Sequence, residues 1–170
     1  MADKNGCPTF MIIAIVAVDR NGAIGKGGKL PWHYSADMKF FKETTMENAV
    51  VMGHRTWRTL KDPLPNRLNI ILSRQANIET QDSVVVVRDV ESVLSMARDI
   101  KCDLFVMGGE QVYRSFSPHI EKWIVTEVPM TVAGADTFVP PDYLDGFTRT
   151  QMKEIGEGLK VSIYSRTKPA

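Results

Sequence analysis

The alternation of short apolar runs with stretches of helical spacing constrains the fold of this chain more than any other feature. The first run, residues 10–18 (FMIIAIVAV), is apolar on both faces and rich in β-branched side chains, which is typical of a strand buried inside a sheet. We predict further strands at residues 50–52, 68–72, 83–87, 104–107 and 123–128.

Helices are predicted between these strands. Ser35 is a plausible N-cap for a helix that runs to about Thr45, with Asp37 in its first turn. Asp89 is expected to cap another helix, in which four apolar side chains share one face: Val90, Val93, Leu94 and Ala97. Two shorter helices are predicted at residues 55–60 and 110–116.

Strands that alternate with helices indicate an α/β fold with a central, mostly parallel sheet of about eight strands and helices on both faces. The tail, residues 146–154 and 159–167, predicts an antiparallel C-terminal hairpin. The 170 residues fit a single domain, which we place at residues 11–168 after a short polar leader at residues 1–10. Ligands of such sheets bind beyond the carboxyl ends of the strands.

Charge and composition argue against several classes of protein. The net charge is +1 without a basic stripe, so we expect no nucleic-acid partner. No apolar run approaches the roughly 20 residues of a membrane span, and the start lacks the apolar core of a signal peptide. With Cys7 and Cys102 as the two thiols, we expect a cytoplasmic protein without disulfides or membrane contact, and by default a monomer.

Motif spacing argues against three kinds of chemistry. His33, His54 and His119 lack the spacing of metal ligands, so we expect no metal. The chain has neither the G-x-S-x-G turn of a serine hydrolase nor the Walker loop of a nucleotide kinase.

Two predicted strands end at glycines from which a helix begins, in residues 50–56 (VVMGHRT) and 105–113 (FVMGGEQVY). At such a turn the free N–H groups and the helix dipole favour an anion, and glycine lets the backbone approach a phosphate. Either turn alone could be a simple tight bend, but two of them favour a ligand that carries a pyrophosphate. Neither turn matches G-x-G-x-x-G, so the spacing does not identify a dinucleotide.

Asp37 and Arg67 are the two charged residues with the most informative surroundings. Asp37 shares a helix face with Met38 and Phe41, so it could be a carboxylate in an apolar pocket that binds paired N–H donors, with a raised pKa. The alternative is a first-turn Asp that faces water. Arg67 follows Pro63-Leu64-Pro65-Asn66, and it could be either a bidentate clamp for a carboxylate or a surface charge on a loop.

The ordered set of motifs resembles the dihydrofolate reductase family. The matching segments occur in the family's order between about residues 11 and 167: Ile24-Gly25, Leu30-Pro31-Trp32, Asp37 with Phe41, 51–57 (VMGHRTW), 63–67 (PLPNR), 69–74 (NIILSR), 106–109 (VMGG), Val112-Tyr113, Thr126 and 136–138 (DTF). The resemblance implies an oxidoreductase that reduces 7,8-dihydrofolate to 5,6,7,8-tetrahydrofolate with NADPH, within one-carbon metabolism, and that binds antifolate inhibitors.

The resemblance also implies roles for individual residues on the substrate side. Asp37 would hydrogen-bond the 2-amino group and N3 of the pterin, Thr126 would hydrogen-bond Asp37, and Trp32 would help to hold a water. Arg67 would grip the α-carboxylate of the glutamate tail. The remaining substrate contacts would be Ile15, Val16, Met38, Phe41, Leu60, Leu64, Met107 and Tyr113.

On the cofactor side, the resemblance implies that Ala17 and Ile24 lie beside the nicotinamide and that the segment from Gly22 to Lys29 is a mobile loop. The two glycine turns would take the phosphates, and Ser73 and Arg74 would lie near the adenosine ribose. The full set of implied cofactor contacts is Ala17, Ile24, Gly25, Gly53, His54, Arg55, Thr56, Leu72, Ser73, Arg74, Gly108, Gly109, Gln111, Val112 and Tyr113.

This sequence departs from the family pattern near the 2′-phosphate. Gln111 stands where some bacterial relatives carry an arginine, which leaves His54, Arg55 and Arg74 as the expected contacts. The bond between Gly108 and Gly109 is cis in the family.

The mechanism implied by the resemblance moves the proton through water, because Asp37 lies too far from pterin N5 in the family's geometry. Asp37 would orient the pterin and favour its N5-protonated form. Two other functions are considered: a catalytically silent module that binds a pteridine or nucleotide, and the NADPH-dependent pyrimidine reductase of riboflavin synthesis. Asp37, Trp32 and Thr126 argue against the first, and Leu30-Pro31-Trp32 together with Asp37 and Arg67 argues against the second.

Overall fold

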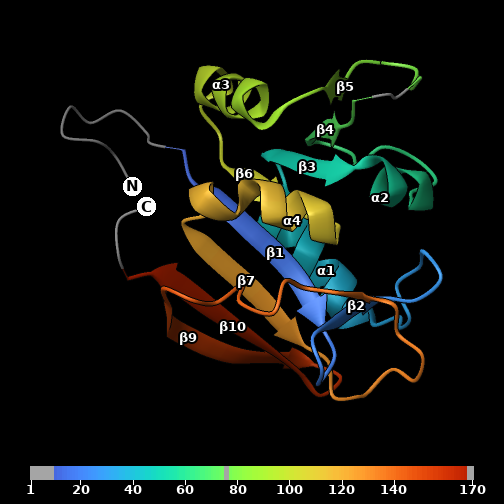
Figure 1. The fold of residues 1–170 in the computed structure, drawn as a ribbon, viewed down its shortest axis with the longest axis vertical. Helices are drawn as coiled ribbons and strands as arrows, with labels where there is room; N and C mark the ends of the chain where they lie inside the picture. Colours follow the sequence, from blue (N-terminus) through green and yellow to red (C-terminus); the bar gives the residue numbers. More distant parts are fainter. Residues whose placement is uncertain (1–9, 75–76, 168–170) are drawn as a thin grey trace.

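An eight-stranded sheet runs through the part of the chain that the computed structural model describes, residues 10–74 and 77–167 (Figure 1). The strand order is β5-β4-β3-β6-β1-β7-β10-β9. The first six of these strands are parallel to one another, whereas β10 is antiparallel to both β7 and β9. The strands are β1 (Ile12–Val18), β3 (Ala49–Gly53), β4 (Leu68–Leu72), β5 (Val84–Val87), β6 (Leu104–Val106), β7 (Lys122–Glu127), β9 (Phe147–Gly156) and β10 (Leu159–Arg166).

The predicted α/β fold is therefore confirmed, including the sheet of eight strands and the antiparallel hairpin. Predicted and observed strand ends agree within two residues. The leader predicted at residues 1–10 lies outside the described residues except for Phe10, and so does Cys7. Cys102 is a free thiol.

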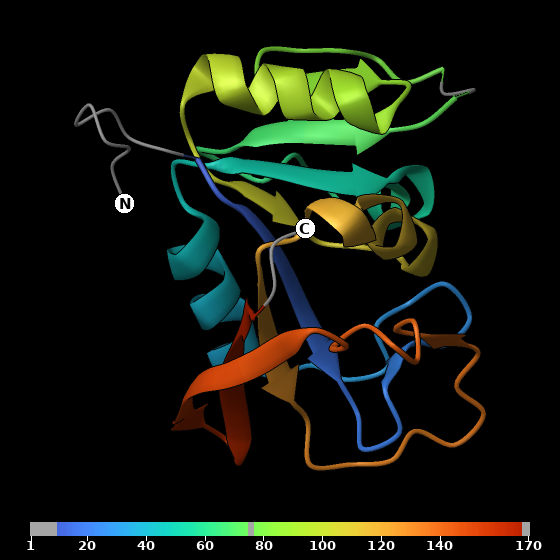
Figure 2. The ribbon, with the colours of Figure 1, turned by 60° about the vertical axis from the view of Figure 1, so that its left-hand side comes forward.

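Helices cover both faces of the sheet (Figure 2). Alternate residues of β1 face opposite sides, as expected for a strand. Ile12, Ala14 and Val16 belong to a core cluster with α3 and α4, whereas Ile13 and Ile15 belong to a second cluster with side chains of α1 and α2. The helices are α1 (Ser35–Thr45), α2 (His54–Thr59), α3 (Val90–Ile100), α4 (Glu110–Phe116) and the short 3-10 helix η1 (Ser117–His119). The predicted Asp89 cap of α3 is confirmed, because its carboxylate accepts the Ser92 N–H at 2.8 Å.

A small second sheet, which the sequence did not predict, pairs β2 (Ala23–Gly25) with β8 (Thr137–Phe138). Neither segment carries the continuous apolar run or the alternation of apolar and polar residues that marks a strand. The buried Asp19 carboxylate holds this region together, because it accepts the N–H groups of Asn21, Ala23 and Val132, each at 2.8 Å. The segment from Gly22 to Lys29 therefore lies against the segment that follows β7.

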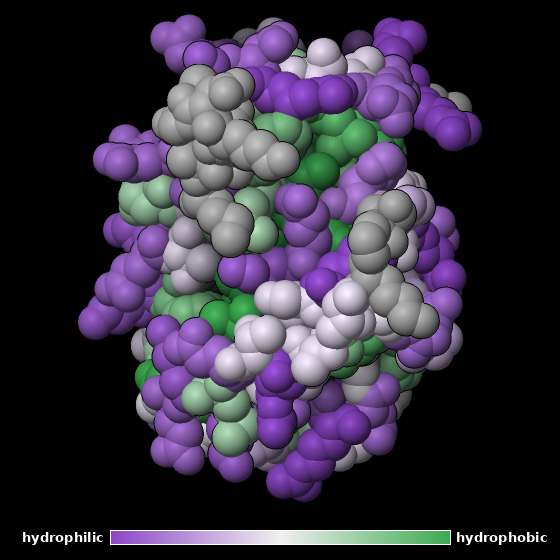
Figure 3. Space-filling view, turned by 90° about the vertical axis from the view of Figure 1, so that its left-hand side faces the viewer, coloured by the Kyte–Doolittle hydropathy of each residue, from purple (hydrophilic) through white to green (hydrophobic). Residues whose placement is uncertain are grey.

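Figure 3 views the molecule from the side at which the parallel strands begin. Hydrophilic side chains cover much of this face, and the hydrophobic ones are visible in separate areas between them. Among the described residues, no helix is long and apolar enough to span a membrane.

Candidate active site

The start of α1, which carries Asp37, differs from the prediction. Ser35 is the first helical residue rather than the N-cap, and the N-cap residue Tyr34 forms no side-chain cap. Glu157, in the turn between β9 and β10, supplies the missing acceptor: its carboxylate accepts the Ala36 N–H at 2.8 Å. A carboxylate at a helix N-terminus also interacts favourably with the helix dipole. Gly156, next to this turn, also lies close to α1: a Cβ added to it would lie 3.7 Å from the Ala36 Cβ, an ordinary van der Waals distance.

Asp37 is half-buried at this end of α1, where the Thr126 hydroxyl hydrogen-bonds its carboxylate. Thr126 is 2% exposed and lies in β7, opposite Ala17 of β1. Burial raises the pKa of Asp37 above its ordinary value, and the hydrogen bond from Thr126 partly offsets this shift. Asp37 and Thr126, which lie 89 positions apart in the sequence, are thus brought together as expected.

Trp32 is buried beside this pair, in a small cluster with Val128 and Leu159 that partly buried Ala17 and Ala36 contact. Within the described residues, its indole Nε1 is a buried donor without a hydrogen-bond partner. Such donors are rare in folded proteins unless a ligand or water accepts the hydrogen bond. Trp32 thus presents a buried donor for which a ligand or a water would be a suitable acceptor.

The predicted substrate contacts divide between the two faces of the sheet. Ile15 lies in one core cluster, against which four partly buried side chains pack: Phe41, Leu60, Leu64 and Met107. Val16 and Tyr113 lie in the other cluster, although the Tyr113 hydroxyl reaches β1 and donates to the Ile15 carbonyl oxygen at 2.7 Å. Met38, predicted beside Asp37, is 56% exposed. The side chains of Val16 and Tyr113 are therefore not brought into the cluster that contains Phe41.

Arg67 is buried rather than a surface charge, with 5% of its area exposed. Its Nε donates to the Pro65 carbonyl oxygen at 3.0 Å, and its Nη1 donates to the Thr45 hydroxyl at 3.0 Å. Its guanidinium carbon lies 5.9 Å from the centre of the Phe41 ring. Burial lowers the pKa of Arg67, but an arginine stays charged at neutral pH. The site thus contains a buried cation in a fixed orientation.

Asp37 and Arg67 lie at opposite ends of α1. Asp37 is in the first turn, and Arg67 contacts Phe41 and Thr45, four and eight residues further along. At 1.5 Å per residue, Asp37 and Thr45 are about 12 Å apart along the helix axis. We expected ligands beyond the carboxyl ends of the strands, but Arg67 directly precedes β4 at the other end of the sheet. The candidate site is therefore elongated and follows α1.

The two glycine turns predicted to bind phosphates lie side by side. They follow the adjacent strands β3 and β6, and the Gly53 N–H donates to the Gly108 carbonyl oxygen at 2.9 Å. No side chain caps α2 or α4. A Cβ at Gly53 would lie 3.2 Å from Val112, and Gly108 has φ +112°, a conformation that favours glycine. The Gly108–Gly109 bond is cis, as the resemblance implied.

The predicted cationic residues follow the ends of two adjacent strands, β3 and β4. Gly53 of β3 is opposite Leu72 of β4, so His54 and Arg55 follow one strand where Ser73 and Arg74 follow its neighbour. His54, Arg55 and Arg74 are all exposed, as is Gln111. The carboxyl ends of these two strands thus present two arginines and one histidine to solvent.

Sequence reasoning missed three residues of this region: Thr45, Asn69 and Glu157. Asn69 is fully buried, and its side-chain amide bonds both the N–H and the carbonyl of Leu64 and the carbonyl of Arg67, which fixes the loop before β4. A polar residue within the apolar run 68–72 was a usable signal for Asn69, since polar groups in buried strands need partners. Nothing local marked Thr45 or Glu157.

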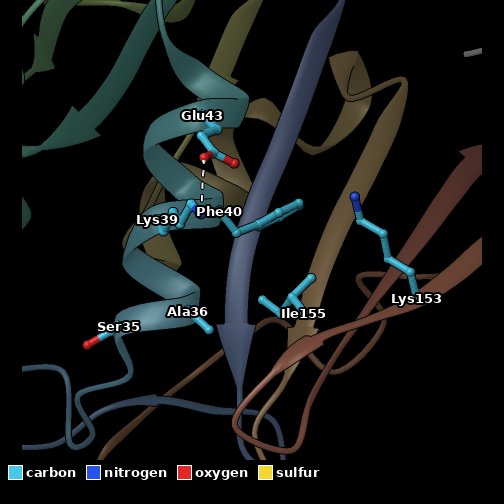
Figure 4. A pocket seen from close by; sticks show the side chains of 7 residues that line it. All are labelled: Ser35, Ala36, Lys39, Phe40, Glu43, Lys153 and Ile155. Carbon is cyan, nitrogen blue, oxygen red and sulfur yellow. Dashed lines mark ion pairs between the residues drawn. The ribbon is translucent and has the colours of Figure 1, made fainter.

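A hollow of about 380 Å³ between α1 and β9 lies on another side of the same helix (Figure 4). Phe40 and Ile155 form its apolar floor, and the Lys153 ammonium lies 5.2 Å from the centre of the Phe40 ring. Lys39 and Glu43 form an exposed ion pair at its rim, 3.9 Å apart. A second hollow of about 490 Å³ lies between α2 and residues 77–81. Neither is lined by Asp37 or Arg67.

Within the described residues, no group of three or more His, Cys, Asp or Glu side chains could hold a metal ion.

Comparison with known proteins agrees with this geometry. The family model for dihydrofolate reductase matches residues 11–165. The dihydrofolate reductase of Enterococcus faecium is 35% identical, over 88% of this chain and 87% of that protein, and the one of Staphylococcus haemolyticus is 32% identical, over 84% of each. The bifunctional dihydrofolate reductase-thymidylate synthase of Zea mays is 37% identical, but the chain spans only 30% of its length.

A solved structure has the same fold. Dihydrofolate reductase from Enterococcus faecalis, complexed with NADP(H) and RAB-propyl, superimposes with a TM-score of 0.84 at 32% sequence identity. The match covers 93% of this chain and 97% of that chain. The resemblance found in the sequence motifs is thus confirmed: this chain belongs to the dihydrofolate reductase family, whose members are NADPH-dependent oxidoreductases.

Proposed function

We propose that this protein reduces 7,8-dihydrofolate to 5,6,7,8-tetrahydrofolate with NADPH. The observation that carries the proposal is the placement of two charged residues at opposite ends of α1. Asp37 is half-buried and hydrogen-bonded to Thr126 at one end, and Arg67 is buried at the other. An elongated ligand that has N–H donors at one end and a carboxylate at the other fits this arrangement. Dihydrofolate has both, in its pterin ring and its glutamate tail.

Asp37 would hold the pterin by accepting hydrogen bonds from its 2-amino group and N3. A carboxylate whose pKa is raised by burial gains from any partner that brings positive charge, so the ionised Asp37 favours the N5-protonated pterin. Thr126 fixes the carboxylate in place. The proton would reach N5 through a water, and the unpartnered indole Nε1 of Trp32 is a suitable donor to hold one nearby.

NADPH, when bound, supplies a hydride from C4 of its nicotinamide. The chain offers a fitting cradle for its pyrophosphate, because two adjacent glycine turns present uncapped helix starts and a Cβ at Gly53 would crowd Val112. Ala17 and Ile24 would contact the nicotinamide, and Thr56, Leu72, Ser73, Gln111 and Val112 would contact the rest of the cofactor. Gly25 would position the loop beside it.

The direct test is the absorbance of NADPH at 340 nm. We expect it to fall steadily when the purified protein is mixed with NADPH and dihydrofolate, and to stay constant when either the protein or dihydrofolate is omitted. A protein that binds both ligands without any loss of absorbance would instead be the catalytically silent binding module.

We further expect a preference for NADPH over NADH, because His54, Arg55 and Arg74 follow two adjacent, paired strands and would lie near the 2′-phosphate. Hydrogen bonds to charged groups contribute about 1.5–3 kcal/mol when well formed, and exposed pairs contribute less. Arg55→Ala or Arg74→Ala should therefore lower the ratio of kcat/KM for NADPH to that for NADH by roughly threefold to tenfold.

The measurement compares both cofactors at 20 mM and 300 mM salt. Salt should reduce the parent's preference, because exposed charges are screened. Arg98→Ala, a change at an exposed arginine in the last turn of α3, is the matched control and should leave the ratio unchanged. If both site variants keep the parental ratio, other residues hold the 2′-phosphate.

A further inference from the structure

The end of α1 farthest from Asp37 holds a hydroxyl group that the proposed reaction does not use. Thr45 is completely buried in the last turn of the helix. Its Oγ1 donates to the Phe41 carbonyl oxygen at 2.8 Å and accepts from Nη1 of Arg67 at 3.0 Å. A hydroxyl has a single proton, so its donation to Phe41 directs its lone pairs toward the guanidinium. Thr45 is therefore an acceptor with a fixed orientation.

Arg67 is held along two edges of its planar guanidinium. Nε donates to the Pro65 carbonyl oxygen and Nη1 donates to Thr45. A guanidinium has five N–H groups, so one on Nη1 and two on Nη2 remain for other partners. A carboxylate can accept two parallel hydrogen bonds from Nη1 and Nη2 at the tip of the plane. The two anchored edges leave this tip for a ligand.

The same turn of α1 also places an aromatic ring beside the guanidinium. The Phe41 ring lies 5.9 Å from the guanidinium carbon, and the Phe41 carbonyl is the group that fixes the Thr45 hydroxyl. The backbone of Arg67 is fixed separately, since the buried Asn69 amide bonds its carbonyl oxygen. Thr45 therefore contacts the guanidinium itself, whereas Asn69 fixes the loop that carries Arg67.

We infer that Thr45 is a positioning residue for substrate recognition, because it turns the Nη1–Nη2 tip of Arg67 toward the α-carboxylate of a glutamate-bearing folate. The inference rests on the proposed role of Arg67. Valine has nearly the shape of threonine, but it would leave a buried Nη1 donor without its acceptor. The guanidinium would then rotate to find another partner, and the paired contact with the carboxylate would be lost.

The test uses two ligands that differ only in the glutamate: methotrexate and 4-amino-10-methylpteroic acid, which is methotrexate without it. Thr45→Val should weaken methotrexate about tenfold and change the affinity of the pteroic acid less than twofold. The KM for dihydrofolate should rise about tenfold, while kcat at saturating substrate stays within twofold of the parent. Thr45→Ser, which keeps the hydroxyl, is the matched control. It should bind both ligands within twofold of the affinities of the parent.

A purely structural role for Thr45 would give a different result, because a loosened fold weakens both ligands alike. Equal weakening of the two ligands by Thr45→Val, or no weakening of either, would overturn the inference. Should Thr45→Val fail to fold, Thr45→Ala removes the same acceptor with a smaller side chain, and the same difference between ligands is expected of it.

Arg67→Lys separates a failure of this inference from a failure of the proposed tail contact. If Arg67→Lys still binds methotrexate more tightly than the pteroic acid by the parental ratio, the carboxylate binds elsewhere and the proposed role of Arg67 is wrong. If Arg67→Lys reduces this affinity ratio but Thr45→Val keeps it, only the role of Thr45 is wrong. In the Arg67→Lys background, Thr45→Val should change methotrexate affinity less than twofold, because the two residues act on one contact.

Discussion

Replacing Asp37 by asparagine should lower the rate of the hydride step by about two to three orders of magnitude at pH 7, in line with the usual contribution of a group that assists proton transfer. The amide keeps the shape of the side chain and can still accept a hydrogen bond from the pterin. It cannot favour the N5-protonated pterin, because it carries no charge. Some substrate binding should therefore survive while the chemical step slows.

The dependence of this step on pH distinguishes the proposed role from a general loss of structure. Activity of Asp37→Asn should partly recover as the pH falls, because solvent then protonates the substrate without help from the enzyme. The measurement is single-turnover loss of NADPH absorbance between pH 5 and pH 9 for parent and variant. A rate near that of the parent at pH 7, or no gain in acid, would show that another group governs the proton.

Stability provides the control for this variant. Because burial raises the pKa of Asp37, the folded state binds its proton more tightly than the unfolded state does. The ionised carboxylate therefore disfavours the fold, and this cost grows as the pH rises from the unfolded pKa of about 3.9 through the higher pKa of the folded state. Thermal melts at pH 7 should show Asp37→Asn to be at least as stable as the parent, so its lost activity would not reflect unfolding.

Replacing Arg67 by lysine should weaken methotrexate by roughly tenfold to a hundredfold and should raise the KM for dihydrofolate. A lysine ammonium cannot reproduce the planar fork that binds both carboxylate oxygens, and each charge-assisted hydrogen bond contributes about 1.5–3 kcal/mol. Trimethoprim, which lacks a glutamate, should bind the variant within about twofold of its affinity for the parent. Fluorescence titration of both inhibitors measures the difference.

The chemistry of the tail allows a sharper version of this experiment. Methotrexate with its α-carboxylate converted to an amide should bind the parent and Arg67→Lys alike, whereas the γ-amide should still distinguish them. Arg149→Lys, on the exposed strand β9, is the matched control substitution and should change neither inhibitor. Equal weakening of methotrexate and trimethoprim by Arg67→Lys would mean that Arg67 does not bind the tail.

The parts of the fold and site that the sequence predicted correctly are those encoded by local patterns. Residues 12–18 and 68–72 are strands because apolar, β-branched side chains are buried on both faces of the sheet. Asp89 caps α3 because its acceptor lies three residues before the N–H that it binds. The family motifs pointed to Asp37 and Arg67 because order along the chain, together with residue type, was enough to identify them.

The parts that could not be predicted depend on contacts between distant segments. Ser35 has the residue type of an N-cap, but Glu157 accepts the N–H of Ala36 from 121 positions away. Thr45 reads as an ordinary residue near a helix end until the fold places Arg67 beside it. The pairing of β2 with β8 likewise joins two short segments that carry no pattern of their own. The residues around each position do not indicate which distant residue the fold will place against it.

Glu157 is synthesised long after α1, the helix whose first turn it stabilises. As the chain leaves a ribosome, α1 emerges long before β7 brings Thr126 and before the last hairpin brings Glu157. The final strand, β10, inserts between β7 and β9 rather than adding to the outside of the sheet. A nascent chain therefore holds nearly all the residues that would touch the substrate while Asp37 still lacks Thr126 and Ala36 still lacks Glu157. We therefore expect tight folate binding to need the segments that carry Thr126 and Glu157, and a ligand in the cell to stabilise chains that already contain both over shorter nascent ones.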